Sequence, residues 1–128
     1  MKFLSYNIQY GKGQQGKHNL YRVAEVIKEA DIVCLQEIEK FWQRSGFVDQ
    51  AQILSEFLPK FYSVYGPALD MDASLKNEYG QISNQRRQFG NMICLDIQLY
   101  LQEIFLYQNR ELVQIQNIQF KELCWRPL

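Results

Sequence analysis

Histidine is almost absent from this 128-residue sequence, because His18 is the only one. It precedes a predicted helix start and has no acidic neighbour, so we do not expect a catalytic histidine–acid pair there. Excess charge is absent too, since 14 Lys and Arg residues balance 14 Asp and Glu residues. Modules dedicated to duplex nucleic acid are usually basic, because phosphate neutralisation dominates their affinity. Neutrality therefore argues against such a module and favours small phosphorylated molecules or single strands, with a local basic patch left open.

Cysteine is scarce and irregularly spaced. The three cysteines Cys34, Cys94 and Cys124 form no C-x-x-C pair, which argues against a disulfide framework and against a zinc site. No apolar run reaches the length of a transmembrane helix, and the N-terminus lacks the apolar stretch and cleavage site of a signal peptide. We therefore expect a reduced, cytoplasmic setting and no membrane partner, and we leave the oligomeric state open.

The residues that are present predict a globular domain that begins with a strand, a helix and a second strand. Hydrophobic residues make up 47% of the sequence and aromatic residues 14%, enough for one domain with a core. An apolar strand is expected over Met1–Ile8. A helix is expected from about Asn19 to Ala30, because its apolar residues recur with helical spacing and Asn19 suits an N-cap. The run DIVCLQE at Asp31–Glu37 is typical of a strand buried on both faces.

Two oxygen-bearing side chains stand at the ends of these strands. A helix that connects two strands of one sheet makes them parallel, so Asn7 and Glu37 are expected side by side at one rim. An amide oxygen and a carboxylate are hard ligands that suit Mg²⁺, which also takes waters and phosphate oxygens. The alternative is that Glu37 only opens a solvated loop.

Three motifs in order resemble the endonuclease/exonuclease/phosphatase superfamily of metal-dependent hydrolases: LSYNIQYG at Leu4–Gly11, DIVCLQEIE at Asp31–Glu39 and RRQFGNMI at Arg86–Ile93. The resemblance implies that Glu37 binds the catalytic metal, Mg²⁺ or Mn²⁺. It also implies that Asn7 helps to place the metal and the scissile phosphate. Gln9 stands where family members often carry an acidic residue, so a second acidic ligand on this strand is not expected.

Three further side chains are candidate contacts for the substrate phosphate: Arg44, Arg87 and Asn91. A guanidinium matches phosphate oxygens bidentately, and Arg87 belongs with Arg86 to the one adjacent basic pair of the sequence. Asn91 matches the strand asparagine of the resembled family. The alternatives are a solvated loop arginine at Arg44, and at Arg86 and Arg87 charges that keep an edge strand from pairing with another sheet.

The middle of the chain predicts more elements of a layered α/β domain. A helix is expected over about Gln50–Leu58, and a strand over Phe61–Tyr65 that Gly66–Pro67 stops. The polar stretch Asp70–Glu78 is interpreted as a loop. The glycine-rich stretch Tyr10–His18 is either an active-site loop or a plain surface loop. This order predicts an α/β fold, and by resemblance the N-terminal half of a four-layer α+β sandwich.

From residue 94 the sequence departs from the family pattern, which would continue as L-S-R-x-P. We therefore assign residues 1–93 to the N-terminal part of the domain and residues 94–128 to an atypical tail. With synonymous codons chosen to suit, the tail re-read one base back begins LSRYP and later contains IQRTVLEA, as the family pattern would. We interpret the tail as an out-of-frame translation and the domain as truncated. Within the tail, QIQNIQ at Gln114–Gln119 alternates like a strand but has no evident partner.

Two functions from different classes follow. The first is a metal-dependent hydrolase of phosphate esters, nuclease-like or phosphodiesterase-like, in which water attacks a phosphate held by a magnesium ion; nucleic acid is one possible substrate. The resembled family takes its general base from a histidine near the C-terminus, and no histidine follows His18 here. The second function is therefore that of an inactive truncated fragment or a non-catalytic binding remnant.

Overall fold

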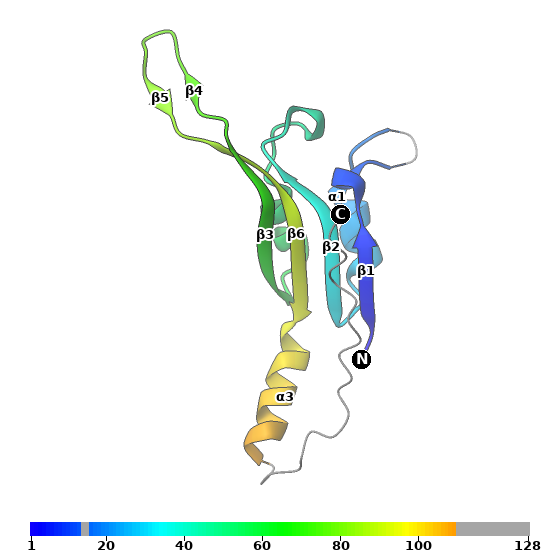
Figure 1. Ribbon diagram of the computed structural model, residues 1–128. Coiled ribbons are helices and arrows are strands. Elements are labelled where there is room, and N and C mark those ends of the chain that lie inside the picture. The colour runs from blue at the N-terminus through cyan, green and yellow to red at the C-terminus, as the bar shows by residue number, and fades with distance from the viewer. Residues whose placement is uncertain (14–15, 110–128) are drawn as a thin grey trace.

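A computed structural model describes residues 1–13 and 16–109 of the chain (Figure 1). It contains a four-stranded sheet in the order β1-β2-β6-β3 and a two-stranded sheet of β4 and β5. The strands are β1 Phe3–Asn7, β2 Ile32–Lys40, β3 Phe61–Asp72, β4 Leu75–Lys76, β5 Ile82–Ser83 and β6 Arg86–Asp96. The helices are α1 Leu20–Ile27, α2 Gln50–Phe57 and α3 Ile97–Asn109, with short 3-10 turns η1 Gln9–Gly11 and η2 Gln43–Ser45.

The N-terminal unit β1–α1–β2 confirms the predicted parallel crossover. Asn7 of β1 lies opposite Gln36 of β2 in a parallel ladder. Helix α1 begins after Asn19, whose Oδ1 accepts a hydrogen bond from the Arg22 N–H at 3.0 Å. Asp49 caps α2 in the same way. A side-chain oxygen at this position satisfies an amide that the first helical turn leaves free, so both helices start where local sequence chemistry predicts.

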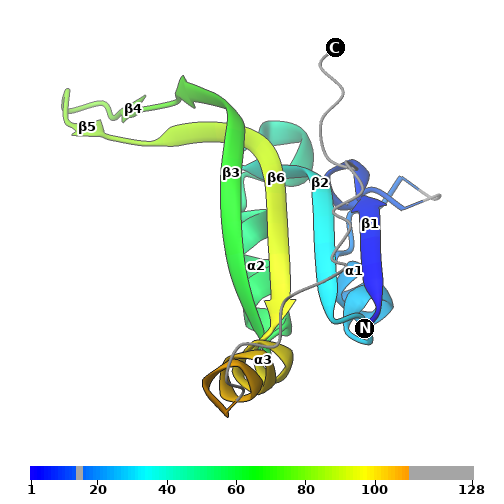
Figure 2. The ribbon, with the colours of Figure 1, turned by 60° about the horizontal axis from the view of Figure 1, so that its bottom comes forward.

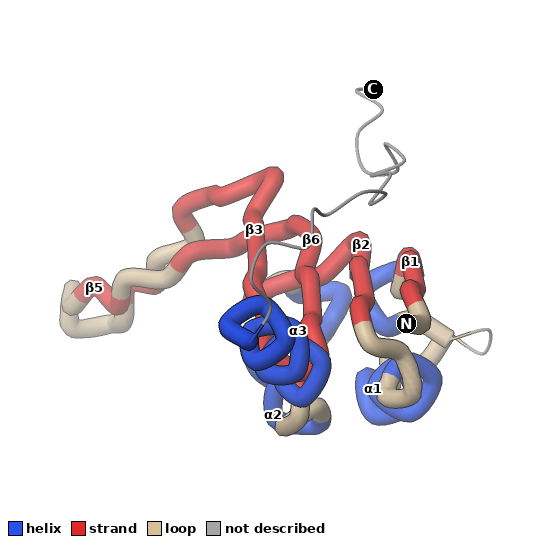
Figure 3. The backbone as a smooth tube through the Cα atoms, turned by 90° about the horizontal axis from the view of Figure 1, so that it is seen from below, coloured by secondary structure: helices blue, strands red, loops and turns tan. Residues whose placement is uncertain are grey.

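One face of the four-stranded sheet packs against α1 and α2. Figures 2 and 3 show both helices on the same side of the strands. Ser63 of β3 marks this face, because its Oγ lies 2.9 Å from Oγ of Ser55 on α2. Between the sheet and the helices lies the core of buried apolar residues, which are Ile8, Val23, Ala24, Ile27, Ala30, Val33, Leu35, Ile38, Ala51, Leu54, Leu58, Phe61, Met92 and Cys94.

The opposite face of the sheet is apolar and uncovered in the described part of the chain. Side chains alternate along a strand, so Tyr62 and Val64, which flank Ser63, point away from the helices. Both are more than half exposed, as are Phe3 of β1 and Ile93 of β6. A sheet with two apolar faces is typical of a sandwich whose second layer packs on the open side. The fold is mixed α/β and fits part of an α+β sandwich, as the sequence predicts.

Strand β2 is longer than the sequence predicts. It was expected to end at Glu37 but continues to Lys40, because a bulge between Leu35 and Ile38 inserts an unpaired residue and lets pairing with β6 resume. A local apolar pattern cannot reveal such a bulge, since it depends on the neighbouring strand. The predicted strand end at Glu37 is therefore wrong, although Glu37 still lies at an irregular point of the sheet.

Strand β3 passes through Gly66 and Pro67, where the sequence predicts a stop. Because β3 is an edge strand, the missing N–H of a proline is tolerated there. The register shifts between Pro67 and Leu69, and the strand then runs on to Asp72. The prediction of a loop over Asp70–Glu78 is therefore wrong for the residues up to Asp72, which belong to β3, and for Leu75–Lys76, which form β4.

Gly90 allows the backbones of β3 and β6 to approach closely where β3 passes through Gly66 and Pro67. A Cβ at Gly90 would lie 2.1 Å from the carbonyl oxygen of Gly66 and 2.7 Å from Cα of Pro67. Both are backbone atoms, which cannot move aside as a side chain would. We expect Gly90→Ala to lower the free energy of unfolding by about 3 kcal/mol, measured by urea denaturation. Gly66→Ala is the matched control, because a Cβ there meets nothing within 4 Å; equal losses in both variants would contradict this account.

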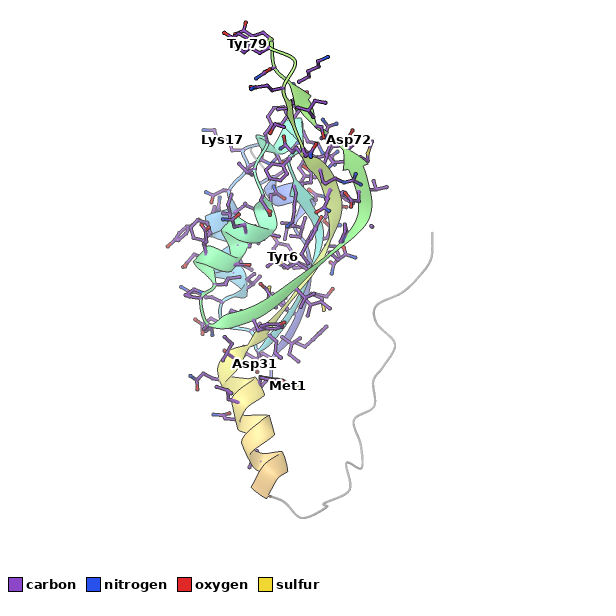
Figure 4. All side chains as sticks on the ribbon, turned by 90° about the vertical axis from the view of Figure 1, so that its left-hand side faces the viewer. Met1, Tyr6, Lys17, Asp31, Asp72 and Tyr79 are labelled. Carbon is purple, nitrogen blue, oxygen red and sulfur yellow. The ribbon has the colours of Figure 1, made fainter. Side chains whose placement is uncertain are left out.

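Strands β4 and β5 form a hairpin arm beyond the ends of β3 and β6 (Figure 1). Tyr79 lies at its tip, 81% exposed (Figure 4). At the base of the arm Arg86 Nε donates to Asp70 Oδ1 at 2.9 Å, and this hydrogen bond raises the pKa of Arg86 and lowers the pKa of Asp70. Asp72 accepts hydrogen bonds from Ser74. The two aspartates thus have local structural partners.

Strand β6 crosses the predicted domain boundary at residue 93, since it runs to Asp96 and continues into α3. The segment QIQNIQ lies outside the described residues, so its strand-like pattern stays a prediction. The assignment of residues 94–128 to an out-of-frame tail also stays a prediction. In the described part of the chain, no helix has the length and apolar character needed to cross a membrane.

Buried Cys94 is expected to make the protein less stable at alkaline pH. Burial raises the pKa of its thiol from 9.0 to about 11. Below pH 9 the thiol is protonated in both states, but between pH 9 and about 11 it ionises first in the unfolded chain, so stability falls as pH rises. We expect the urea midpoint of the wild type to drop across this interval more steeply than that of Cys94→Ala. Parallel pH profiles would contradict this assignment, because all other groups cancel in the comparison.

Candidate functional site

Asn7 and Glu37 meet where β1 and β2 lie side by side, which confirms their predicted proximity. Nδ2 of Asn7 donates a hydrogen bond to Oε1 of Glu37 at 2.8 Å. The other end of the amide is also fixed, because Asn7 Oδ1 accepts from the Gln9 N–H at 2.9 Å. Asn7 is exposed and Glu37 half-buried. The carboxylate is therefore held by a partner and remains within reach of solvent.

The backbone of Glu37 adopts a left-handed conformation. Its φ is +62°, a region that costs a residue with a side chain about 1–3 kcal/mol. Leu35 lies opposite Met92 and Ile38 opposite Gly90, so Gln36 and Glu37 together face the single residue Asn91. Bulges of this kind redirect a side chain at the edge of a site. The bulge thus places the Glu37 carboxylate against Asn7 at the cost of local strain.

Strained backbone is concentrated around the ends of β1 and β2. The non-glycine residues with positive φ in the described segments are Gln9, Tyr10, Glu37, Phe41 and Phe47. All lie in β2 or in the turns that follow β1 and β2. Such conformations persist only where surrounding contacts enforce them, and they gather at functional sites. This clustering marks the same rim that Asn7 and Glu37 occupy.

Glu39, two residues beyond Glu37, is a buried charge that the sequence analysis missed. Its side chain is fully buried and pairs through Oε1 with Arg44, whose Nε donates at 2.6 Å. Oε2 of Glu39 is buried without a hydrogen-bond partner. The hydrogen bond to Glu39 raises the pKa of Arg44. The sequence carried no signal for this pair, because its five-residue spacing matches neither helix nor strand period.

Arg44 is stacked on aromatic rings as well as paired with Glu39. Its guanidinium carbon lies 4.3 Å from the ring centre of Tyr10 and 5.2 Å from that of Trp42. Half of its side chain is exposed. The structure thus gives Arg44 a partner other than solvent, and its predicted contact with a substrate phosphate stays a prediction.

The other two candidate phosphate contacts lie on β6. The guanidinium carbon of Arg87 is 5.4 Å from the ring centre of Trp42, and its Nε is buried without a hydrogen-bond partner. Asn91 is exposed and lies on the neighbouring strand β6, opposite the bulge of β2. Arg86 instead pairs with Asp70 on the edge strand β3. Because Arg86 itself lies on β6, between β2 and β3 in the sheet, the alternative of an edge-strand charge is wrong for it. Arg87 and Asn91 remain candidates for substrate binding.

The glycine-rich segment after β1 folds back on itself. Lys12 and His18 form an isolated bridge, and His18 Nδ1 lies 3.0 Å from the carbonyl oxygen of Tyr10. Gly11 is needed in the η1 turn, because its φ is +77° and a Cβ there would lie 2.8 Å from Leu20 Cδ2. His18 thus has a structural partner in the Tyr10 carbonyl.

The side chains at the rim can hold a magnesium ion only if one carboxylate, that of Glu37, is enough protein ligand. No group of three His, Cys, Asp or Glu side chains converges to hold a metal within the residues that the structure describes. Mg²⁺ commonly needs only one or two carboxylates, since waters and substrate phosphate oxygens complete its shell. Glu37 Oε2 takes no part in the hydrogen bond to Asn7 and is the oxygen suited to this role. Asn7 Oδ1 is held by Gln9, so Asn7 as a direct metal ligand stays a prediction.

The fold resembles that of a solved protein. The structure is similar to the crystal structure of an endonuclease/exonuclease/phosphatase from Beutenbergia cavernae DSM 12333, with a TM-score of 0.50 and 21% sequence identity. The match covers 72% of this chain and 25% of that protein, so this chain spans about a quarter of its length. No protein-family model matches the sequence, and neither does any curated protein. The chain therefore shares its fold with part of an endonuclease/exonuclease/phosphatase protein.

Proposed function

We propose that this chain carries the metal-binding part of a phosphate-ester hydrolase of the endonuclease/exonuclease/phosphatase type. The observation that carries the proposal is the Asn7–Glu37 hydrogen bond at 2.8 Å, made by a glutamate in a strained bulge at the shared rim of two parallel strands. A strained, oriented and solvent-accessible carboxylate is typical of a site built for a ligand rather than for stability. The fold shared with a hydrolase supports the same conclusion.

In this proposal each side chain has a limited task. Glu37 holds Mg²⁺ or Mn²⁺ through its carboxylate, and Asn7 fixes the orientation of that carboxylate and faces the phosphate. When bound, the metal neutralises charge on the phosphate and makes bound water more acidic. Arg87, Asn91 and Arg44 are the candidates that bind phosphate oxygens, since guanidinium and amide groups donate the hydrogen bonds that such oxygens accept. The substrate is a phosphate ester, with nucleic acid among the options.

A second candidate function is non-catalytic binding by an inactive fragment. It is favoured by one specific observation: the histidine of the described chain, His18, is bonded to the Tyr10 carbonyl rather than placed beside Glu37 and an acid. A hydrolase that uses water as nucleophile works best with a positioned general base. A chain that binds metal and phosphate without such a base would retain ligand affinity and lack turnover.

Hydrolysis of bis(4-nitrophenyl) phosphate by the full chain separates the two functions. Turnover that depends on Mg²⁺ and stops with a chelator supports the hydrolase. Metal binding without turnover supports the binding remnant, and absence of both contradicts the proposed site. Folding is verified in each case by circular dichroism, so that an unfolded sample is not scored as an inactive one.

A further inference from the structure

Gln50, the first residue of α2, connects the two segments that carry Asn7 and Glu37. Its side chain is 1% exposed. Oε1 accepts the backbone N–H of Glu39 at 3.0 Å, and Nε2 donates to the backbone carbonyl of Tyr10 at 2.7 Å. One buried amide group thus binds the chain two residues after Glu37 and three residues after Asn7.

This bridge lies just beyond the end of regular pairing between β1 and β2. The ladder ends where Asn7 faces Gln36, and one more backbone bond, from Ile8 N–H to the Gln36 carbonyl at 3.1 Å, follows it. Past that point both segments adopt strained conformations, with φ of +46° at Tyr10 and +62° at Glu37. Since sheet hydrogen bonds no longer hold the segments together, other contacts must fix their separation.

A second connection, made by Arg44, joins Tyr10 and Glu39 through their side chains. Arg44 pairs with Glu39 and places its guanidinium carbon 4.3 Å from the ring centre of Tyr10. Tyr10 and Glu39 are therefore linked twice, by Gln50 between their backbones and by Arg44 between their side chains. Of the two links, the Gln50 bridge is the more buried one, because its bond to Glu39 is buried and its bond to Tyr10 partly buried, whereas half of the Arg44 side chain is exposed. Solvent therefore competes less with the Gln50 bridge.

We propose that Gln50 is a positioning residue for the Asn7–Glu37 pair, an inference that rests on the proposed function in so far as that pair binds metal. The bridge fixes the distance between the end of β1 and the bulge of β2. Without it, the strained backbones of Tyr10 and Glu37 relax and the Asn7–Glu37 hydrogen bond lengthens or breaks. Residues that hold a metal ligand in place in this way typically change metal affinity about 10–100-fold when they are replaced.

The test uses Gln50→Met in the full chain, because methionine has similar length and cannot form either hydrogen bond. Gln50→Asn, which keeps the amide but shortens its reach, provides a second variant should the first fail to fold. Two variants are controls. Gln52→Met changes an exposed glutamine of the same helix, and Ile27→Val removes one methyl group from a fully buried core residue. Urea denaturation ranks the stability of all four.

Two readouts are compared: Mn²⁺ affinity by calorimetry, and hydrogen exchange of the Asn7 side-chain amide by nuclear magnetic resonance. We expect the Gln50 variants to weaken Mn²⁺ binding about tenfold or more and to speed exchange at Asn7, whereas both controls stay near wild type. Unchanged values in the Gln50 variants, or equal losses in Ile27→Val, would overturn the positioning role. If the wild type binds no Mn²⁺ the proposed function fails, and exchange at Asn7 still decides the role of Gln50.

Discussion

Glu37→Gln is expected to weaken Mg²⁺ and Mn²⁺ binding by at least about 100-fold, because a direct ligand should cost no less than the partners that orient it. Glutamine keeps the size of the side chain and an oxygen that accepts from Asn7 Nδ2, so the 2.8 Å hydrogen bond has a replacement. What disappears is the negative charge. Any metal-dependent turnover should fall with the affinity, measured at saturating substrate across a metal titration.

The control for this variant is Glu25→Gln on α1. Glu25 pairs with Lys28 at 2.8 Å on the exposed surface of the helix, outside the bulge and outside the turns that carry the strained residues. The same chemical change there should leave metal affinity within about twofold, since Glu25 is not part of the proposed site and its exposed ion pair contributes little to stability. A Glu37→Gln variant that binds metal as well as Glu25→Gln does would remove Glu37 from the site.

Arg44→Met is expected to destabilise the protein by about 2–3 kcal/mol. Removing one partner of a buried ion pair usually costs about 3–5 kcal/mol, because the other charge stays buried without compensation. Glu39 is fully buried, but half of the Arg44 side chain is exposed. Water can therefore partly replace the lost guanidinium, and we expect a smaller loss than for a fully buried pair. The free energy of unfolding from urea titration measures the loss.

The charge argument is tested by adding Glu39→Gln to Arg44→Met. The double variant leaves no unpaired charge at position 39, so it should recover most of the lost stability, as replaced buried ion pairs commonly do. Lys28→Met provides the comparison with an exposed ion pair, for which a change within about 0.5 kcal/mol is expected. A double variant as unstable as Arg44→Met alone would mean that packing of Arg44 on Tyr10 and Trp42, rather than its charge, supports this region.

The features that sequence alone predicted are those set by local spacing. The helix after Asn19 and its cap follow from residues within a few positions of one another. Parallel pairing of β1 with β2 follows from the crossover, and it brings Asn7 near Glu37, although the bulge that turns the Glu37 carboxylate towards Asn7 is set by β6. This is why the candidate metal site was visible before the structure.

The features that sequence missed depend on contacts between distant segments. The bulge at Glu37 is set by pairing with β6, and β3 continues past Pro67 because Gly90 lets the two backbones approach. The sequence did not single out Glu39, because its burial depends on Arg44 and the turn around it. The sequence did not single out Gln50 either, and only the folded chain shows that it joins the segments that follow Asn7 and Glu37.

The central claim, that Glu37 binds a divalent metal at the shared rim of β1 and β2, is tested most directly by paramagnetic broadening. Mn²⁺ is titrated at low concentration into the ¹⁵N-labelled chain. We expect the amide signals of Asn7, Gln36, Glu37 and Asn91 to broaden first, and the same signals to stay sharp in Glu37→Gln. Broadening centred instead on Asp70 and Asp72, or unchanged by the substitution, would contradict the account.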